Sequence, residues 1–172
     1  MKKMWSPWRS KHIDAISKTP AAGSGDLFER IAASDRDADN LVVWRGERVF
    51  VVMNLYPYNN GHLLIVPYRK VAWYEDLTSD EQADLASSIE RCIRWLRAAL
   101  DPEGFNVGMN LGPAAGAGVP DHMHVHVVPR WSGDTNFMPT TADVKVIPES
   151  MKETYRKLRA AVDEGSGRDD LQ

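Results

Sequence analysis

The chain has 172 residues, 43% of them hydrophobic and 26% charged, and a formal net charge of −3. These values describe one ordinary globular domain, and the mild acidity argues against a protein that coats nucleic acid, which would carry a basic stripe. No apolar run approaches the roughly 20 residues of a membrane helix, so we expect a cytoplasmic protein with no membrane partner.

The first predicted elements are an N-terminal arm and a short helix. Residues 1–25 are rich in Ser, Lys, Gly, Ala and Pro, and they read as an arm that packs through Trp5 and Trp8. Residues 26–33 follow as a short helix, which Asp26 is suited to cap because its side chain can accept from free backbone N–H groups.

Three strands are predicted next. Residues 41–44 and 48–53 read as a hairpin around a tight turn that contains glycine. The loop 57–61 combines proline, asparagine and glycine, three strong turn formers. Residues 62–66 are apolar on both faces, which predicts a central strand that Pro67 ends.

A long helix follows. Thr78 with Glu81, or Ser79 with Gln82, supplies a capping box at its start. Apolar residues then recur at helical spacing on one face: Leu85, Ile89, Ile93, Leu96 and Leu100.

The remaining chain contains two strands, a loop of small residues and a last helix. Residues 105–110 and 122–128 read as strands, with the loop 112–118 between them. Pro148 opens a C-terminal helix that reaches residue 162. Residues 163–172 hold few apolar side chains and are expected to be a disordered tail, so the single domain spans residues 26–162.

Three of the five histidines alternate at positions 122, 124 and 126. On a strand their side chains would share one face, while Met123, Val125 and Val127 would face a core. An exposed polar face is a poor explanation, because Thr or Lys would serve it as well. Two readings remain: a metal site with imidazole ligands, and a nucleophilic imidazole with its helpers.

The loop before this strand favours the second reading. It has three glycines and three alanines among seven residues, and such small residues let backbone amides approach a phosphate closely. A bare metal site does not need such a loop. By itself the loop is an ordinary turn; beside three histidines it indicates a phosphate site.

At this point the sequence resembles the histidine triad (HIT) superfamily. Residues 122–128 are similar to its signature, and the segments 50–67, 106–112, 129–131 and 133–137 are similar to its other characteristic segments. The resemblance covers about residues 26–160 and is greatest to the branch of bacterial diadenosine tetraphosphate phosphorylases, then to Fhit-type hydrolases. It implies an α+β fold with an antiparallel sheet of about five strands, one long helix and a C-terminal helix, and a homodimer whose sheet continues across the interface.

The resemblance also implies the site residues. The family's nucleophile falls on His124, which would attack the α-phosphorus and form a nucleotidyl-histidine. His126 and His62 match histidines that contact the phosphates, and Asn54 and Asn110 match residues that contact the sugar and a phosphate. His122 would be either a further catalytic residue or a structural one that holds the loop against the strand. The loop whose backbone faces the phosphates matches Gly116, Ala117, Gly118 and Val119, although its length differs by one residue from that of the hydrolase branch.

Some relatives hold a zinc through a Cys-x-x-Cys pair, a later histidine and the first triad histidine. The matching positions here hold Asp26, Glu29, Lys70 and His122, and Cys92 is the only cysteine of the chain. A carboxylate-rich site is disfavoured by the lysine, so we expect neither a metal nor another cofactor.

The expected function is therefore cleavage of diadenosine polyphosphates, by phosphorolysis or by hydrolysis. His126 disfavours the hexose-1-phosphate nucleotidyltransferase branch, which has glutamine there, but does not separate the other two reactions. Two alternatives stay open: a hydrolase of nucleoside phosphoramidates or mixed anhydrides, and a nucleotide-binding regulator with little turnover. The expected partners are a nucleotide substrate and a second copy of the chain, with no nucleic acid.

Overall fold

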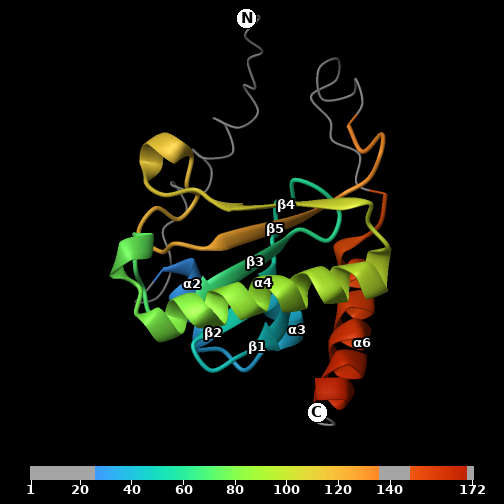
Figure 1. Ribbon diagram of the computed structural model, residues 1–172, viewed down its shortest axis with the longest axis horizontal. Helices are drawn as coiled ribbons and strands as arrows, with labels where there is room; N and C mark the ends of the chain where they lie inside the picture. Colours follow the sequence, from blue (N-terminus) through green and yellow to red (C-terminus); the bar gives the residue numbers. More distant parts are fainter. Residues whose placement is uncertain (1–25, 136–147, 170–172) are drawn as a thin grey trace, which may run out of the picture.

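The computed structural model describes residues 26–135 and 148–169, so the predicted N-terminal arm lies outside it. Its centre is a five-stranded antiparallel sheet with the order β1-β2-β3-β5-β4 (Figure 1). The strands are β1 (Val42–Arg45), β2 (Val49–Met53), β3 (Leu63–Pro67), β4 (Gly104–Met109) and β5 (Val125–Arg130). This confirms the predicted α+β fold and its number of strands.

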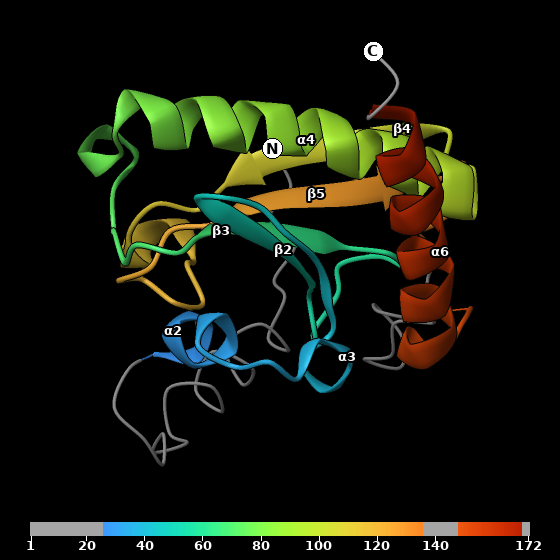
Figure 2. The same ribbon diagram turned by 90° about the horizontal axis from the view of Figure 1, so that it is seen from below.

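One face of the sheet is covered by α4 (Ser79–Leu100), with α6 (Met151–Asp169) packed against α4 and β1 (Figure 2). Thr78 and Glu81 form the capping box of α4, the first of the two predicted pairs. The apolar stripe of α4 buries Leu85 and Leu96 against Val51, Ile65 and Val125 of the sheet. This layer is the larger hydrophobic core.

The opposite face carries two short helices, α2 (Leu27–Ala32) and α3 (Asp37–Asn40) (Figure 2). Asp26 caps α2 as predicted, in a capping box with Glu29. Phe28 is buried with Val52, Leu64 and other sheet residues in a second, smaller core. Two short 3-10 turns, η1 (Tyr74–Asp76) and η2 (Pro113–Ala115), complete the structure that is described.

The C-terminal helix corrects one prediction. A disordered tail was expected from residue 163, but α6 continues to Asp169. Gly165 allows the helix to pass close to α4, since a Cβ atom there would lie 3.3 Å from Nε1 of Trp95. Packing against α4 thus extends a helix that local composition does not favour. Within the described residues, no helix combines the length and apolarity that crossing a membrane requires.

The histidine segment corrects another prediction. β5 begins at Val125, not at residue 122, because the N–H of Met123 donates to the carbonyl of Val71 instead of joining the ladder. The alternation of side chains still holds. Met123, Val125 and Val127 belong to the larger core, whereas His122 and His124 contact Phe28 on the other face.

Candidate active site

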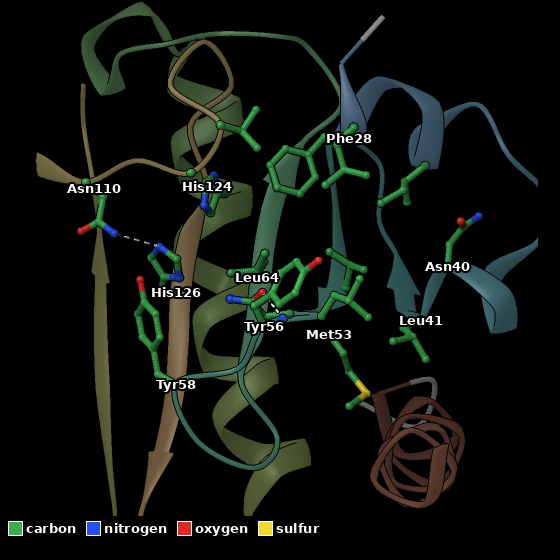
Figure 3. Close-up of a pocket in the computed structure, with 18 of the residues that line it drawn as sticks. Phe28, Asn40, Leu41, Met53, Tyr56, Tyr58, Leu64, Asn110, His124 and His126 are labelled. Atoms are coloured by element: carbon green, nitrogen blue, oxygen red, sulfur yellow. Dashed lines mark hydrogen bonds between the residues drawn. The ribbon is translucent and has the colours of Figure 1, made fainter. Parts of the chain in front are cut away.

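A pocket of about 320 Å³ lies between α2, the β2–β3 connection and the histidine segment (Figure 3). One side of it is polar, with His124, His126, Asn110 and Asn54. Tyr58 lies beside His126 on this side (Figure 3). The other side is mainly apolar, and its residues come from α2, the end of α3, the sheet and the β2–β3 connection. They are Leu27, Phe28, Ile31, Asn40, Leu41, Val52, Met53, Leu55, Tyr56 and Leu64.

His62 stands just before β3, behind the polar side of the pocket, and is buried. Gly61 has a φ of +75°, and a Cβ atom there would lie 2.4 Å from Leu100, so this turn needs glycine. The backbone N–H of Tyr58 donates to Nδ1 of His62 over 3.0 Å, and Nδ2 of Asn54 lies 3.3 Å from the same atom. Since Nδ1 accepts, the proton of a neutral His62 is on Nε2.

The proton on Nε2 of His62 determines which ring nitrogen of His126 is protonated. Nε2 of His62 lies 3.0 Å from Nδ1 of His126, so Nδ1 accepts and His126 carries its own proton on Nε2. Nδ2 of Asn110 lies 3.3 Å from that nitrogen (Figure 3), and a 180° flip of the Asn110 amide places its oxygen there to accept a hydrogen bond from Nε2–H. His126 is therefore a hydrogen-bond donor on the pocket wall.

His124 is oriented by its own chain. Its Nδ1–H donates to the carbonyl of His122 over 3.0 Å, which leaves the lone pair on Nε2. Its ring packs 5.1 Å from Phe28 and 4.9 Å from His126, measured between centroids. Burial lowers the pKa of His124 below its usual 6.5, and the nearby His122 lowers it further, although the bond to the carbonyl opposes this. The side chain is thus a neutral imidazole at neutral pH, as a nucleophile must be.

His122 does not line the pocket. It is fully buried, its Nε2 lies 2.9 Å from the carbonyl of Pro67, and its Nδ1 lies 3.1 Å from Oδ2 of Asp26. Of the two roles expected for His122, these contacts favour the structural one.

The other predicted residues divide in the same way. Asn54, Asn110, Gly116, Gly118 and Val119 line the pocket, whereas Ala117 does not. Gly116 has a φ of +83°, and no atom lies within 4 Å of the position of a Cβ atom. The loop therefore lines the pocket without a side chain at Gly116 and Gly118, and the contact of its backbone with phosphates remains a prediction.

Sequence reasoning missed the apolar wall and the ring of Tyr58 beside His126. Leu27, Phe28 and Ile31 were predicted only as part of a short helix, and Tyr58 only as part of a loop. Tyr58 nevertheless stacks on His126, with 5.6 Å between centroids and an angle of 24°. The sequence indicates only that residues 27–31 have an apolar face. It does not indicate which surface that face covers.

The four positions that match zinc ligands in some relatives do not fit a zinc ion. Nζ of Lys70 lies 3.3 Å from Asp26 and 3.7 Å from Glu29. The hydrogen bond to Asp26 raises the pKa of Lys70, so the ammonium stays protonated and has no lone pair for a metal. Among residues 26–135 and 148–169, no group of three or more His, Cys, Asp or Glu side chains is arranged to hold a metal ion. The absence of zinc from the protein remains a prediction.

Comparisons with known proteins agree with this geometry. The model of the HIT domain family matches residues 35–133. The chain is 43% identical over 162 residues to the AP-4-A phosphorylase of Mycobacterium tuberculosis (strain CDC 1551 / Oshkosh), over 92% of this chain and 83% of that protein. It is 34% identical over 93 residues to the asymmetrical bis(5'-nucleosyl)-tetraphosphatase of Schizosaccharomyces pombe, over 54% of this chain and 50% of that protein. A solved structure of a Zn-bound histidine triad family protein from Mycobacterium smegmatis matches with a TM-score of 0.67 and 25% identity, over 83% of this chain and 96% of that chain.

The family match spans more than half of the chain, and it contains the histidine motif, the sheet and most of the pocket. The resemblance that the sequence indicated is confirmed: this chain belongs to the HIT family.

Proposed function

We propose that this protein cleaves dinucleoside polyphosphates through a covalent nucleotidyl-His124 intermediate. The observation that supports this best is the orientation of His124. Its Nδ1–H is bound by the carbonyl of His122, so that Nε2 keeps its lone pair on a wall of the pocket. Relatives whose names are AP-4-A phosphorylase and bis(5'-nucleosyl)-tetraphosphatase support the same class of substrate.

In the first step, Nε2 of His124 attacks the α-phosphorus of the dinucleotide. A P–N bond forms, and the bond from phosphorus to the bridging oxygen breaks with its electron pair on the departing phosphate. The imidazole keeps its Nδ1 proton, so the intermediate is a cationic ring whose charge faces the carbonyl of His122. No proton needs to move in this step, which explains why the site works without a catalytic carboxylate beside His124.

The phosphoryl oxygens become more negative as the P–N bond forms. His126 offers its Nε2–H on the same wall, and Asn110, Gly116 and Gly118 line the same pocket. Donors that are fixed before the reaction stabilise such charge without reorganisation.

In the second step an oxygen of inorganic phosphate, or water, attacks the phosphorus from the side opposite His124. The P–N bond breaks and returns its electrons to Nε2. From diadenosine tetraphosphate, phosphate gives ADP beside the ATP released first, whereas water gives AMP and a proton. We propose phosphorolysis as the main reaction, since the phosphorylase relative matches 92% of this chain.

The apolar side of the pocket suits the nucleoside. Leu27, Phe28 and Ile31 of α2 lie on this side together with Val52 and Leu64 of the sheet, and an apolar surface of this kind accepts a base. Asn54 already uses Oδ1 to accept from the N–H of Tyr56. A sugar contact is therefore left to its Nδ2 group, which also lies near His62.

The test is a product analysis with diadenosine tetraphosphate, with and without inorganic phosphate. Formation of ADP and ATP that depends on phosphate supports phosphorolysis. Formation of AMP and ATP would show that the reaction is hydrolysis. An alkaline quench, which preserves P–N bonds, should trap one labelled nucleotide on the wild-type chain and none on H124A. E90Q, on the exposed face of α4, is the matched control that should keep the label. Full activity of H124A would overturn the mechanism, and binding without any turnover would make the protein a nucleotide-binding regulator.

A further inference from the structure

Asp26 joins three parts of the protein that meet behind the pocket. Its Oδ1 accepts from the backbone N–H groups of Phe28 and Glu29, both over 2.9 Å, and so caps α2. Its carboxylate lies 3.1–3.3 Å from Nδ1 of His122. Lys70, which follows β3, places Nζ 3.3 Å from Oδ2. One side chain thus contacts a helix, the histidine segment and the segment that follows a central strand.

His122 is held at both ring nitrogens. Nδ1 faces the carboxylate of Asp26, and Nε2 faces the carbonyl of Pro67 over 2.9 Å. Burial raises the pKa of Asp26, but the Glu29 N–H and the His122 ring lower it more, so the carboxyl is held below its usual range and stays ionised. Both ring nitrogens of His122 thus lie within hydrogen-bond distance of an oxygen atom, and the ring is held between the start of α2 and the end of β3.

The position of His122 sets the orientation of His124. The carbonyl of His122 accepts Nδ1–H of His124 over 3.0 Å. Phe28, which Asp26 holds through the cap of α2, packs 5.4 Å from His122 and 5.1 Å from His124. A shift of His122 would therefore move both the acceptor and the packing surface of the nucleophile.

The cluster of Asp26, Glu29, Lys70 and His122 occupies the place where some relatives hold zinc, and it does not fit that ion. Its contacts nevertheless join the same segments that a metal would join: the start of α2, the segment that follows β3, and His122. An ion cluster here can do what a structural metal does, which is to fix the geometry of nearby groups.

We propose that Asp26 is a positioning residue of the active site, which fixes the orientation of the His124 imidazole through its hydrogen bond to His122. This role rests on the proposed function of His124. It differs from a purely structural role in one measurable way. Loss of positioning slows the covalent step without reducing the number or affinity of nucleotide sites, because a small misplacement of reacting groups costs much rate.

Three variants of the full-length chain separate these roles. Asp26→Ser keeps a capping hydroxyl but is too short to reach His122. Asp26→Asn keeps the cap and places an amide against Nδ1 of His122, which preserves a hydrogen bond when the ring proton is on Nε2, toward the carbonyl of Pro67. Glu29→Gln is the matched control, because it removes one carboxylate from the same cluster but contacts Lys70 and the backbone of Asp26, not His122.

Each variant is tested for single-turnover formation of the nucleotidyl enzyme from diadenosine tetraphosphate, and for the affinity and stoichiometry of AMP by calorimetry. We expect D26S to slow the covalent step by about 10-fold or more, with AMP affinity within about threefold of wild type. D26N should recover most of the lost rate, and E29Q should match wild type.

A single-turnover rate of D26S within about twofold of wild type would overturn the inference. So would a loss of rate that is explained by a loss of AMP binding. Equal losses of rate in D26S and in either D26N or E29Q would also overturn it. Failure of the proposed function gives a different result: a wild-type chain without turnover, or H124A with full activity.

Discussion

Nε2 of His62 lies 3.0 Å from Nδ1 of His126, and this contact fixes the proton of His126 on the nitrogen at the pocket wall. A backbone amide determines where the protons of both histidines lie. The N–H of Tyr58 can only donate, so Nδ1 of His62 must accept and the His62 proton is on Nε2. A buried residue that never reaches the pocket thus controls which groups the pocket offers to a phosphate.

Replacement of His62 tests this control. We expect His62→Leu to lower kcat by about 100-fold, because His126 is then free to move its proton to Nδ1 and a donor to the phosphoryl group is lost. His62→Gln is the matched variant, since its amide can still donate to Nδ1 of His126, and it should keep more activity. Steady-state kinetics with diadenosine tetraphosphate measure both. Equal activities of the two variants would contradict this assignment of the protons on His62 and His126.

The pH dependence of the covalent step tests the state of His124. Burial and the neighbouring His122 lower the pKa of His124 below its usual 6.5, so the neutral form persists to lower pH than in an exposed histidine. The rate of nucleotidyl-enzyme formation should therefore stay level from pH 8 down to about 6.5 and fall only below that value. Single-turnover measurement without inorganic phosphate avoids the ionisation of that second substrate. An inflection above the usual value would show that His124 is not desolvated in this way.

Local signals were enough to predict much of the fold. Thr78 and Glu81 begin α4 because a capping box acts within one turn, and the alternation around Val125 correctly separates a core face from a histidine face. The predicted start of the last strand was wrong because it depends on Val71, a residue distant in sequence whose carbonyl binds the N–H of Met123.

The site was predicted less completely, for the same reason. The three alternating histidines could be identified as site candidates from their type and spacing, whereas His62, Asn54 and Asn110 were identified only through the resemblance to the HIT family. The apolar wall could not be identified in either way, because Leu27 and Ile31 become part of the pocket only when α2 packs across the sheet. The short helix α3 was not predicted either; it has four residues, and Leu41 ends it with a φ of +59°.

Glu81 provides a test of stability against pH. Its carboxylate is buried and accepts hydrogen bonds from the backbone N–H of Thr78 and from Arg69, the latter over 2.7 Å. The hydrogen bond from Arg69 is the main reason why the pKa of Glu81 falls to about 2. Because the folded pKa is depressed, this stabilisation is present above the usual 4.5 and is lost as pH falls toward about 2.

Glu81→Gln should lower the free energy of unfolding by about 1–2 kcal/mol at pH 7 and by less at pH 3. Urea unfolding at the two pH values measures the difference. Glu90→Gln, at an exposed pair with Arg94 on the same helix, should change stability little at either pH. A loss at pH 3 as large as that at pH 7 would show that the charge of Glu81 is not the cause.

The homodimer expected from the resemblance remains a prediction, and β4 is the strand that would form it. Within the part of the chain that the structure describes, β4 is an edge strand that pairs only with β5, and 43% of Val107 is exposed. Unpaired edge groups can extend a sheet into a second copy, and a lysine on the edge discourages this. Light scattering should give a dimer for wild type and for Val107→Thr, and more monomer for Val107→Lys. A wild-type monomer would refute the expected dimer.

The ion cluster around Lys70 predicts that the protein neither contains nor needs zinc. Structural zinc requires deprotonated ligands, and the ammonium of Lys70 lies between the carboxylates that would have to bind the metal. Metal analysis of the purified protein should find far less than one zinc per chain, and dialysis against EDTA should leave the melting temperature and the turnover unchanged. The zinc-bound relative from Mycobacterium smegmatis, treated in parallel, is the control that shows whether the dialysis removes zinc. One zinc per chain, with a loss of stability on its removal, would mean that Lys70 moves aside and that the cluster is a metal site.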